Sequence, residues 1–218
     1  MSFVRIENLS KILSGRCILN NINLEIEKKT INGFIGHNGS GKTMLFRAIC
    51  NFISPSTGKI YVNDILLNKN SEYPVNVGVI IEYPGFIDEY SGYENLRYLY
   101  SIRNKIDNDK LEEIMKLVGI YEHRNTKVKK YSLGMRQRLG LAQAIMEEPE
   151  LLILDEPINA LDSDGIDMFK KIIIELRDKG CTILIATHTK EILLDLFDSV
   201  YVMSDGRIVK NEKESKID

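Results

Sequence analysis

The sequence predicts an α/β fold built on a parallel sheet, and two observations lead to this prediction. A glycine-rich loop at 36–43, GHNGSGKT, joins an apolar strand-like run at 31–35 to a helical run at 44–49. Farther along, strand-like and helical runs alternate at 151–154, 163–179 and 182–186. Because parallel strands need a long crossover between them, usually a helix, this alternation is typical of a parallel sheet with crossover helices.

The other elements are predicted from local patterns, in chain order. Residues 3–35 alternate apolar and polar positions in short runs, which is typical of strands with one solvated face. Short apolar runs predict further strands at 59–62 and 77–81. Helical spacing predicts helices at 91–104 and 107–120.

The composition narrows the classes of protein to consider. The chain has 218 residues with 29 basic and 31 acidic side chains, a formal net charge of −2, so no overall positive field attracts nucleic acid. No apolar stretch approaches the ~18 residues that cross a bilayer, and the N-terminus lacks the apolar core of a secretory signal. Three scattered cysteines, Cys17, Cys50 and Cys181, form no metal-binding or redox spacing and are expected to be reduced core thiols. We therefore expect a cytoplasmic protein.

The loop at 36–43 matches the phosphate-binding pattern G-x-x-x-x-G-K-S/T. Glycine lets successive backbone N–H groups converge on a phosphate chain, and the start of the next helix adds free N–H groups and a positive dipole end. We expect Lys42 to reach the β- and γ-phosphates of a nucleoside triphosphate and the Thr43 hydroxyl to ligate Mg²⁺. An ordinary glycine turn before a helix is the alternative. The candidate nucleotide-binding residues are Gly36, His37, Asn38, Gly39, Ser40, Gly41, Lys42 and Thr43.

Two carboxylates follow the apolar run at 151–154 directly. A strand that aims Asp155 toward the phosphate loop can hold Mg²⁺, and Glu156 beside it can orient or deprotonate the attacking water. A strand that ends in Asp-Glu is, by itself, more often a solvated edge. The preceding phosphate loop favours the catalytic interpretation here.

Three further motifs complete an ordered set. The segment 132–138, SLGMRQR, opens an amphipathic helix, 159–162 reads NALD, and His188 follows the run at 182–186. Together with the phosphate loop and the two carboxylates, they resemble the signature segment, D-loop and switch histidine of ATP-binding-cassette (ABC) ATPases. The resemblance covers nearly the whole chain. It implies a P-loop NTPase of the ABC type in one domain, 1–218, with a mixed, mainly parallel core sheet, an antiparallel β subdomain and a helical subdomain at about 83–131.

The resemblance also implies an assembly and a set of roles. Two chains would form a head-to-tail dimer with two ATP molecules in the interface, each held by the phosphate loop of one subunit and the signature of the other. Ser132 and Gly134 would contact the γ-phosphate in trans, and Asp162 of the D-loop would lie at the same interface. Glu156 would be the general base and His188 the γ-phosphate sensor. ATP and Mg²⁺ are the implied cofactors.

The sequence departs from the family pattern in three places. Leu13 stands where an aromatic residue usually stacks on adenine, Glu82 replaces the glutamine of the Q-loop, and Leu133 replaces the second signature residue, a glycine. Glu82 keeps the implied catalytic and metal-binding role of that position. The combination is similar to the bacitracin and lantibiotic self-resistance branch. It implies an exporter of peptide antibiotics or similar amphipathic compounds, with its permease on a separate chain and the ATPase on the inner face of the cell membrane.

Two rival interpretations were weighed. Residues 104–107 match the guanine-reading N-K-x-D of small GTPases, but their order relative to a D-x-x-G at 162–165 is reversed. We therefore interpret 104–107 as an interhelical turn that caps the next helix. The closer rival is a cytosolic ABC ATPase that acts on ribosomes or DNA. Such proteins typically carry two cassettes or a long coiled-coil insertion, neither of which is seen in this sequence.

Tyrosines cluster between Glu82 and the signature, where the family's helical subdomain receives the permease. Tyrosine suits an interface because it offers a large apolar face and a polar tip. Tyr83, Phe86 and Tyr90 lack helical spacing and are the predicted docking residues. Tyr93, Leu96 and Tyr100 follow helical spacing, so two interpretations stay open for them: they fill the subdomain's own core, or they join the docking surface.

Overall fold

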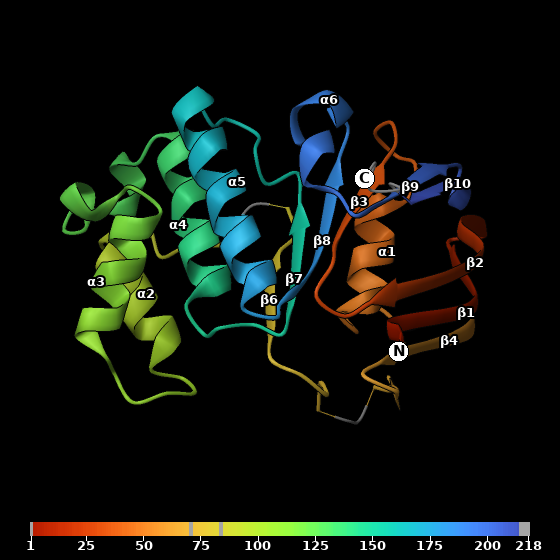
Figure 1. Ribbon diagram of the computed structural model, residues 1–218. Helices are drawn as coiled ribbons and strands as arrows, with labels where there is room; N and C mark the ends of the chain where they lie inside the picture. Colours follow the sequence, from red (N-terminus) through yellow and green to blue (C-terminus); the bar gives the residue numbers. More distant parts are fainter. Residues whose placement is uncertain (1, 70–71, 83–84, 214–218) are drawn as a thin grey trace.

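A computed structural model describes residues 2–69, 72–82 and 85–213, and its frame is a six-stranded sheet in the order β10-β9-β3-β8-β7-β6 (Figure 1). Neighbouring strands are parallel except for β10, which pairs antiparallel to β9. The mixed, mainly parallel core sheet predicted from the sequence is therefore confirmed. Its strands are β3 (Ile31–Ile35), β6 (Val77–Ile80), β7 (Leu151–Asp155), β8 (Thr182–Thr187), β9 (Ser199–Ser204) and β10 (Arg207–Lys213).

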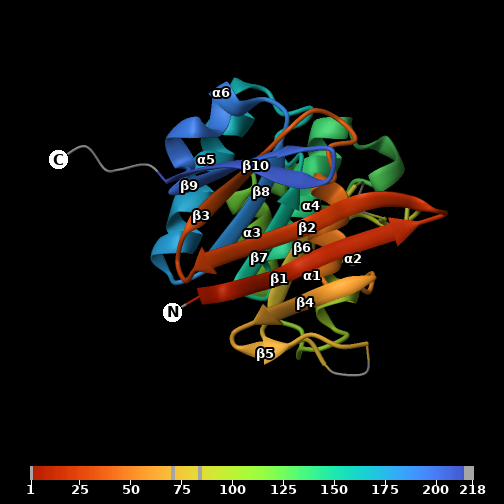
Figure 2. The same ribbon diagram turned by 90° about the vertical axis from the view of Figure 1, so that its right-hand side faces the viewer.

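A second sheet of four antiparallel strands, in the order β2-β1-β4-β5, faces the viewer in Figure 2. It contains β1 (Ser2–Leu13), β2 (Arg16–Glu27), β4 (Thr57–Val62) and β5 (Ile65–Leu66). Along β2 from Leu19 to Ile26, buried and more exposed positions mostly alternate, as expected for a sheet with one solvated face. This sheet is the antiparallel β subdomain that the family resemblance implies.

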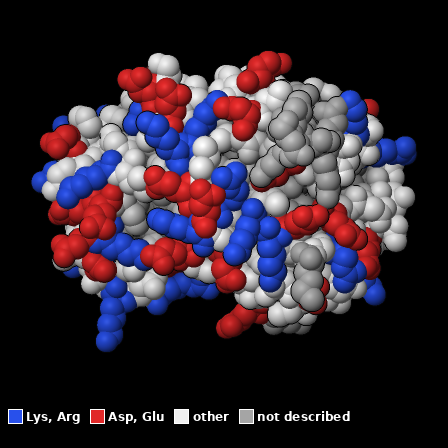
Figure 3. Space-filling model, in the orientation of Figure 1, with Lys and Arg blue, Asp and Glu red and all other residues white. Residues whose placement is uncertain are grey.

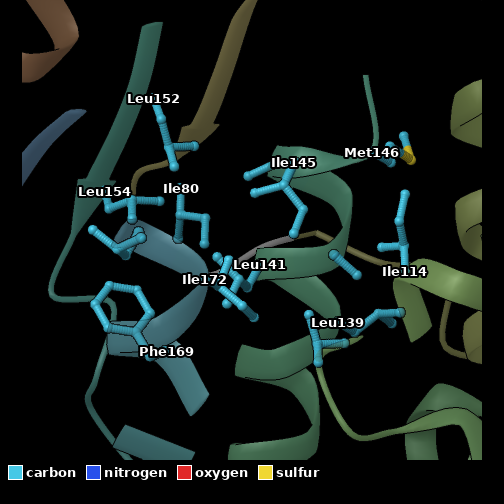
Figure 4. Close-up of a cluster of buried hydrophobic side chains, with 14 of the residues drawn as sticks. Ile80, Ile114, Leu139, Leu141, Ile145, Met146, Leu152, Leu154, Phe169 and Ile172 are labelled. Atoms are coloured by element: carbon cyan, nitrogen blue, oxygen red, sulfur yellow. The ribbon is translucent and has the colours of Figure 1, made fainter. Parts of the chain in front are cut away.

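Helices cover both faces of the core sheet. α1 (Lys42–Ile49) lies between the two sheets, where the Phe46 ring meets Phe34 of β3 edge to face, with centroids 5.2 Å apart. α4 (Leu133–Ile145) and α5 (Ser163–Asp178) pack on the opposite face, as Figure 4 shows for Leu152 and Leu154. Two more helices, α2 (Gly92–Tyr100) and α3 (Asn108–Leu117), pack beside α4, and the short α6 (Lys190–Leu193) follows β8.

The fully buried strand β7 explains how one run of apolar residues supports two cores. Successive side chains of a strand point to opposite faces. Leu152 and Leu154 accordingly join the cluster with α4 and α5, whereas Leu151 and Ile153 join the cluster around α1. A strand buried on both faces is expected to be continuously apolar, as this one is.

Several predicted boundaries shift for local reasons. α2 ends at Tyr100 instead of 104, and the Ser101 hydroxyl donates to the Tyr98 carbonyl at 2.7 Å. β6 ends at Ile80, just before Glu82 adopts a left-handed backbone conformation with φ 61°. The turn at 104–107 caps the next helix as predicted, because the Asp107 carboxylate accepts a hydrogen bond from the Lys110 N–H at 3.0 Å.

The cysteine prediction is right for two residues and wrong for the third. Cys50 and Cys181 are buried, and burial raises the pKa of each thiol to about 12. Cys17 is exposed on β2 because it lies near the tip of the β1–β2 hairpin, outside either core.

In the view of Figure 3, acidic and basic side chains are interspersed over the described residues. No helix in 2–69, 72–82 or 85–213 is long and apolar enough to span a bilayer.

Candidate active site

The register of the core sheet gathers the predicted site residues at one edge. Ile35 at the end of β3 pairs with Thr187 of β8, and Asp155 at the end of β7 pairs with Ala186. The carboxyl ends of the three parallel strands therefore meet. The phosphate loop follows β3, Glu156 follows β7, and His188 follows β8. This is the edge of an open α/β sheet at which ligands bind.

The phosphate loop requires glycine at specific positions. Gly39 and Gly41 have φ values of 85° and 106°, which side chains other than glycine rarely adopt. At Gly36 the obstacle is space, because a Cβ there would lie 2.4 Å from the Met203 carbonyl oxygen and 2.6 Å from the Ser40 hydroxyl. Gly41 also occupies the N-cap of α1, so the loop passes directly into the free N–H groups of the helix.

Two polar groups are buried inside this loop. Lys42 is only 6% exposed, and its ammonium donates to the carbonyls of Gly36 at 2.7 Å and His37 at 3.3 Å. The Ser40 hydroxyl is buried and, among the described residues, has no hydrogen-bond partner. The Lys42 ammonium and the N-terminus of α1 form a positively polarised site that fits a phosphate chain. His37 is exposed and its Nδ1 lies 2.9 Å from the Asn38 carbonyl oxygen.

Asp155 lies against the start of α1. The Thr43 hydroxyl donates to the Asp155 Oδ2 at 2.5 Å. Burial raises the pKa of the Asp155 carboxyl; the Thr43 hydrogen bond and Lys42 oppose the rise, and the charges of Glu156 and Glu82 add to it. The described residues hold no cluster of three or more His, Cys, Asp or Glu side chains able to bind a metal by themselves. One carboxylate beside one hydroxyl is the donor set with which Mg²⁺ binds together with substrate phosphates, so the residues fit that ion.

Glu156 and His188 form the next contact along this edge. The His188 Nδ1 lies 2.9 Å from the Glu156 Oε2, and the Glu156 N–H donates to the Ala186 carbonyl at 2.9 Å. Glu156 has a φ of 51°, a left-handed conformation that turns the chain sharply after β7. Such conformations cost of order 1–3 kcal/mol in a non-glycine residue and cluster at functional sites.

Two predicted site residues, Glu82 and Leu13, have exposed side chains. Glu82 is exposed, and its Oε1 accepts a hydrogen bond from Arg47 of α1 at 2.7 Å. Leu13 ends β1, pairs with Arg16 in the tip of the β1–β2 hairpin and is 42% exposed. It is therefore available for an apolar contact with a ligand.

The signature residues lie on the other face of the core sheet, at the start of α4. Ser132 caps this helix by accepting the Met135 N–H at 3.2 Å, and a Cβ on Gly134 would lie 2.8 Å from the Ala160 carbonyl oxygen. Asp162 caps α5 by accepting the Gly165 N–H at 2.9 Å, and this hydrogen bond is the main cause of its lowered pKa. No hydrogen bond between described residues joins the signature or Asp162 to the phosphate loop.

Three side chains around the site were missed by the sequence reasoning. Arg47 pairs with Glu82, Arg136 of α4 pairs with Asp88 at 2.9 Å, and the buried Gln137 donates to the Pro157 carbonyl at 2.9 Å. The last contact ties the signature helix to the loop after Glu156. These partners lie far apart in sequence, so no local pattern could have indicated them. The one available signal was that Arg47, Arg136 and Gln137 fall inside motif helices.

The aromatic residues predicted for docking differ in how far their side chains are buried. Tyr83 lies outside the described residues. Phe86 is partly buried and packs against the core cluster with α4 and α5, so its contact with a permease stays a prediction. Tyr90 is 42% exposed. Leu96 and Tyr100 are buried in that same cluster, and Tyr93 packs against it, which confirms the core interpretation for these three.

Comparisons with known proteins agree with this geometry. A family described as ABC transporter matches residues 19–159. An uncharacterized ABC transporter ATP-binding protein, YybJ of Bacillus subtilis, is 41% identical over 96% of each chain. The bacitracin transport ATP-binding protein BcrA of Enterococcus faecalis is 37% identical over 98% of this chain and 70% of its own. The lantibiotic transport ATP-binding protein SrtF of Streptococcus pyogenes is 33% identical over 97% of this chain and 90% of its own.

A solved structure of an ATP-binding subunit of an ABC transporter has the same fold, with a TM-score of 0.86 over 98% of this chain and 90% of that one at 22% identity. The predicted resemblance, including its bacitracin and lantibiotic relatives, is thereby confirmed. The chain belongs to the ABC transporter family as an ATP-binding subunit, and its activity is ATP hydrolysis.

Proposed function

We propose that this chain is the ATP-hydrolysing subunit of an exporter of peptide antibiotics or similar amphipathic compounds. It would act at the inner face of the cell membrane as a head-to-tail dimer, bound to a permease on a separate chain. The observation that supports the substrate class most strongly is the 37% identity to a bacitracin transport protein along 98% of this chain. We treat 1–218 as one domain, with α2 and α3 inside a helical subdomain at about 83–131.

The arrangement of side chains supports a division of labour in hydrolysis. The loop at 36–43 would bind the triphosphate, with Lys42 turning from the loop carbonyls to the β- and γ-phosphates. Thr43 and Asp155 would hold Mg²⁺, with Glu82 available beside them, and the ion would neutralise charge on the phosphates. Glu156 would accept the proton of the attacking water, and His188, in contact with Glu156, would hold it in place and sense the γ-phosphate. Leu13 would contact the base through its exposed apolar side chain.

The exposed signature supports the dimer. Ser132 and Asp162 are exposed and their capping bonds are made within their own helix starts, which leaves helix N-termini open to an anion from outside. Ser132 would then contact the γ-phosphate of the nucleotide held by a second copy, and Asp162 would lie at the same interface. Tyr90, exposed and just before α2, remains the proposed contact for the permease.

The test is survival of cells under antibiotic challenge. Cells that lack this gene should become several-fold more sensitive to bacitracin-like or lantibiotic peptides, and wild-type protein should restore resistance. The Glu156→Gln variant, made at the same level, should fail to restore it. Unchanged sensitivity to all such peptides, combined with co-purification of ribosomes or DNA instead of a membrane protein, would favour the non-transport alternative.

A further inference from the structure

We infer that Arg47 is a positioning residue that holds the Glu82 carboxylate beside the nucleotide site and competes with Mg²⁺ for it. This inference rests on the proposed role of Thr43 and Asp155 as Mg²⁺ ligands. It assigns to an arginine of α1 a role that the phosphate-loop pattern does not include. The family position of Glu82 is usually a neutral glutamine, so the charge balance of this site needs its own explanation.

The contact itself joins two elements that both lead into the site. Arg47 lies on α1, whose first residues are Lys42 and Thr43, and Glu82 lies just after β6. The Arg47 guanidinium donates to the Glu82 Oε1 at 2.7 Å, with the two side chains 34% and 61% exposed. Glu82 has a left-handed φ of 61°, which ends the extended chain of β6 at this point.

The charges around Asp155 explain why a cation is needed. Asp155 and Glu156 are adjacent carboxylates at the end of β7. Ile80 at the end of β6 pairs with Leu154 of β7, so Glu82 follows the strand that lies beside the one ending in Asp155. A triphosphate would bring further negative charge to the same edge of the sheet. An unpaired Glu82 would repel a metal-free nucleotide, whereas Glu82 paired with Arg47 is neutralised.

The ion pair between Arg47 and Glu82 is weak enough for Mg²⁺ to displace Arg47 from the carboxylate. Exposed ion pairs contribute only ~0.2–1 kcal/mol, which corresponds to a factor of at most about five in an equilibrium constant. A divalent cation near Asp155 attracts the same carboxylate more strongly than one guanidinium does. Glu82 therefore stays on Arg47 without Mg²⁺ and turns to the metal when Mg²⁺ arrives with the nucleotide.

The experiment measures binding of a fluorescent ATP analogue to the purified chain, with EDTA and across an Mg²⁺ titration. In Arg47→Gln, metal-free affinity should fall and the half-saturating Mg²⁺ concentration should also fall, each by about 2–5-fold. In a Glu82→Gln background, Arg47→Gln should change neither quantity measurably. Arg47→Lys, which keeps the charge, should restore values close to those of the wild type.

The matched control is Lys170→Gln. It breaks the ion pair between Lys170 of α5 and Asp195, whose atoms are 2.8 Å apart, and should leave the metal-free affinity and the half-saturating Mg²⁺ concentration unchanged. Equal shifts for Arg47→Gln in both backgrounds would overturn the inference, and so would Arg47→Lys behaving like Arg47→Gln. Failure of the wild-type chain to bind the analogue under any condition would instead overturn the proposed function. Thermal unfolding of each variant confirms that binding is measured on folded protein.

Discussion

The phosphate-loop half and the signature half of the site are held in place in different ways. Lys42 and Ser40 are buried, and Thr43 and Asp155 are joined across two elements of the core. On the signature side, Ser132 and Leu133 are exposed, and the start of α4 is held by a buried hydrogen bond, from Gln137 to the Pro157 carbonyl, and by partly exposed ion pairs such as Arg136–Asp88. Exposed pairs of this kind contribute ~0–1 kcal/mol.

This difference indicates where a ligand is expected to complete the structure. The loop half is preorganised by buried contacts, so one chain is able to bind the phosphates. The signature half presents exposed helix N-termini, and in the proposed dimer it would act on a nucleotide held by another copy. Changes in the first half should therefore alter nucleotide binding by a single chain, whereas changes in the second should alter nucleotide binding only in the assembly.

The largest expected effect is on catalysis. Glu156→Gln removes the carboxylate that contacts His188 but keeps the shape of the side chain, so turnover should fall by roughly 10²–10⁴-fold while ATP binding stays intact. Steady-state ATPase assays and equilibrium binding on the same preparation check this. Turnover near that of the wild type would rule out Glu156 as the general base.

The next effect is on packing of the loop. Gly36→Ala places a Cβ 2.4 Å from the Met203 carbonyl oxygen, so the variant should lose ~1–3 kcal/mol of unfolding free energy and most of its nucleotide affinity. Gly85→Ala is the matched control, because a Cβ there meets nothing within 4 Å. Urea unfolding measures both variants. Equal stability of the two would show that the loop has room to relax.

A smaller effect is expected at the cap of α4. Ser132→Ala removes the acceptor of the Met135 N–H and should cost ~0.5–2 kcal/mol of stability, whereas Ser132→Asp keeps a capping oxygen and should cost less. Nucleotide affinity of a dilute single chain should be the same in both variants as in the wild type. A drop in that affinity would mean that the two halves of the site meet within one chain.

The smallest effect concerns the base. Leu13 offers apolar contact where aromatic stacking would contribute about 1–3 kcal/mol, so most affinity should come from the phosphates. ATP and GTP should then bind with dissociation constants within about tenfold of each other, or ~1.4 kcal/mol. Strong ATP selectivity in a competition titration would show that another residue stacks on the base.

The local motifs were predictable because the residues that form each motif are close together in the sequence. The phosphate loop, Asp155 with Glu156, and the cap at Ser132 all lie where the spacing placed them. Strand β9 and its partner β10 were not predicted, although β10 includes the charged segment 211–213. Pairing with β9 orders these residues, and a charged composition does not reveal such a tertiary partner.

Contacts between distant segments were the part that sequence could not supply. Arg47 and Glu82 are 35 residues apart, and Asp88 and Arg136 are 48 apart. Their meeting depends on where α1, β6 and α4 lie in the folded chain. For the same reason, the absence of helical spacing around Phe86 did not reveal that its ring packs partly against the core around α4.

The most direct test of a site shared between two copies is a mixing experiment with two inactive variants. Lys42→Ala disables the phosphate loop, and Ser132→Asp keeps the α4 cap while placing a negative charge where the γ-phosphate of the other copy would lie. In a head-to-tail dimer, each mixed pair contains one composite site built from an intact loop and an intact signature. The account predicts that mixing restores ATP hydrolysis to roughly a quarter of the wild-type rate when subunits exchange freely. A mixture no more active than the average of the two variants alone would contradict it.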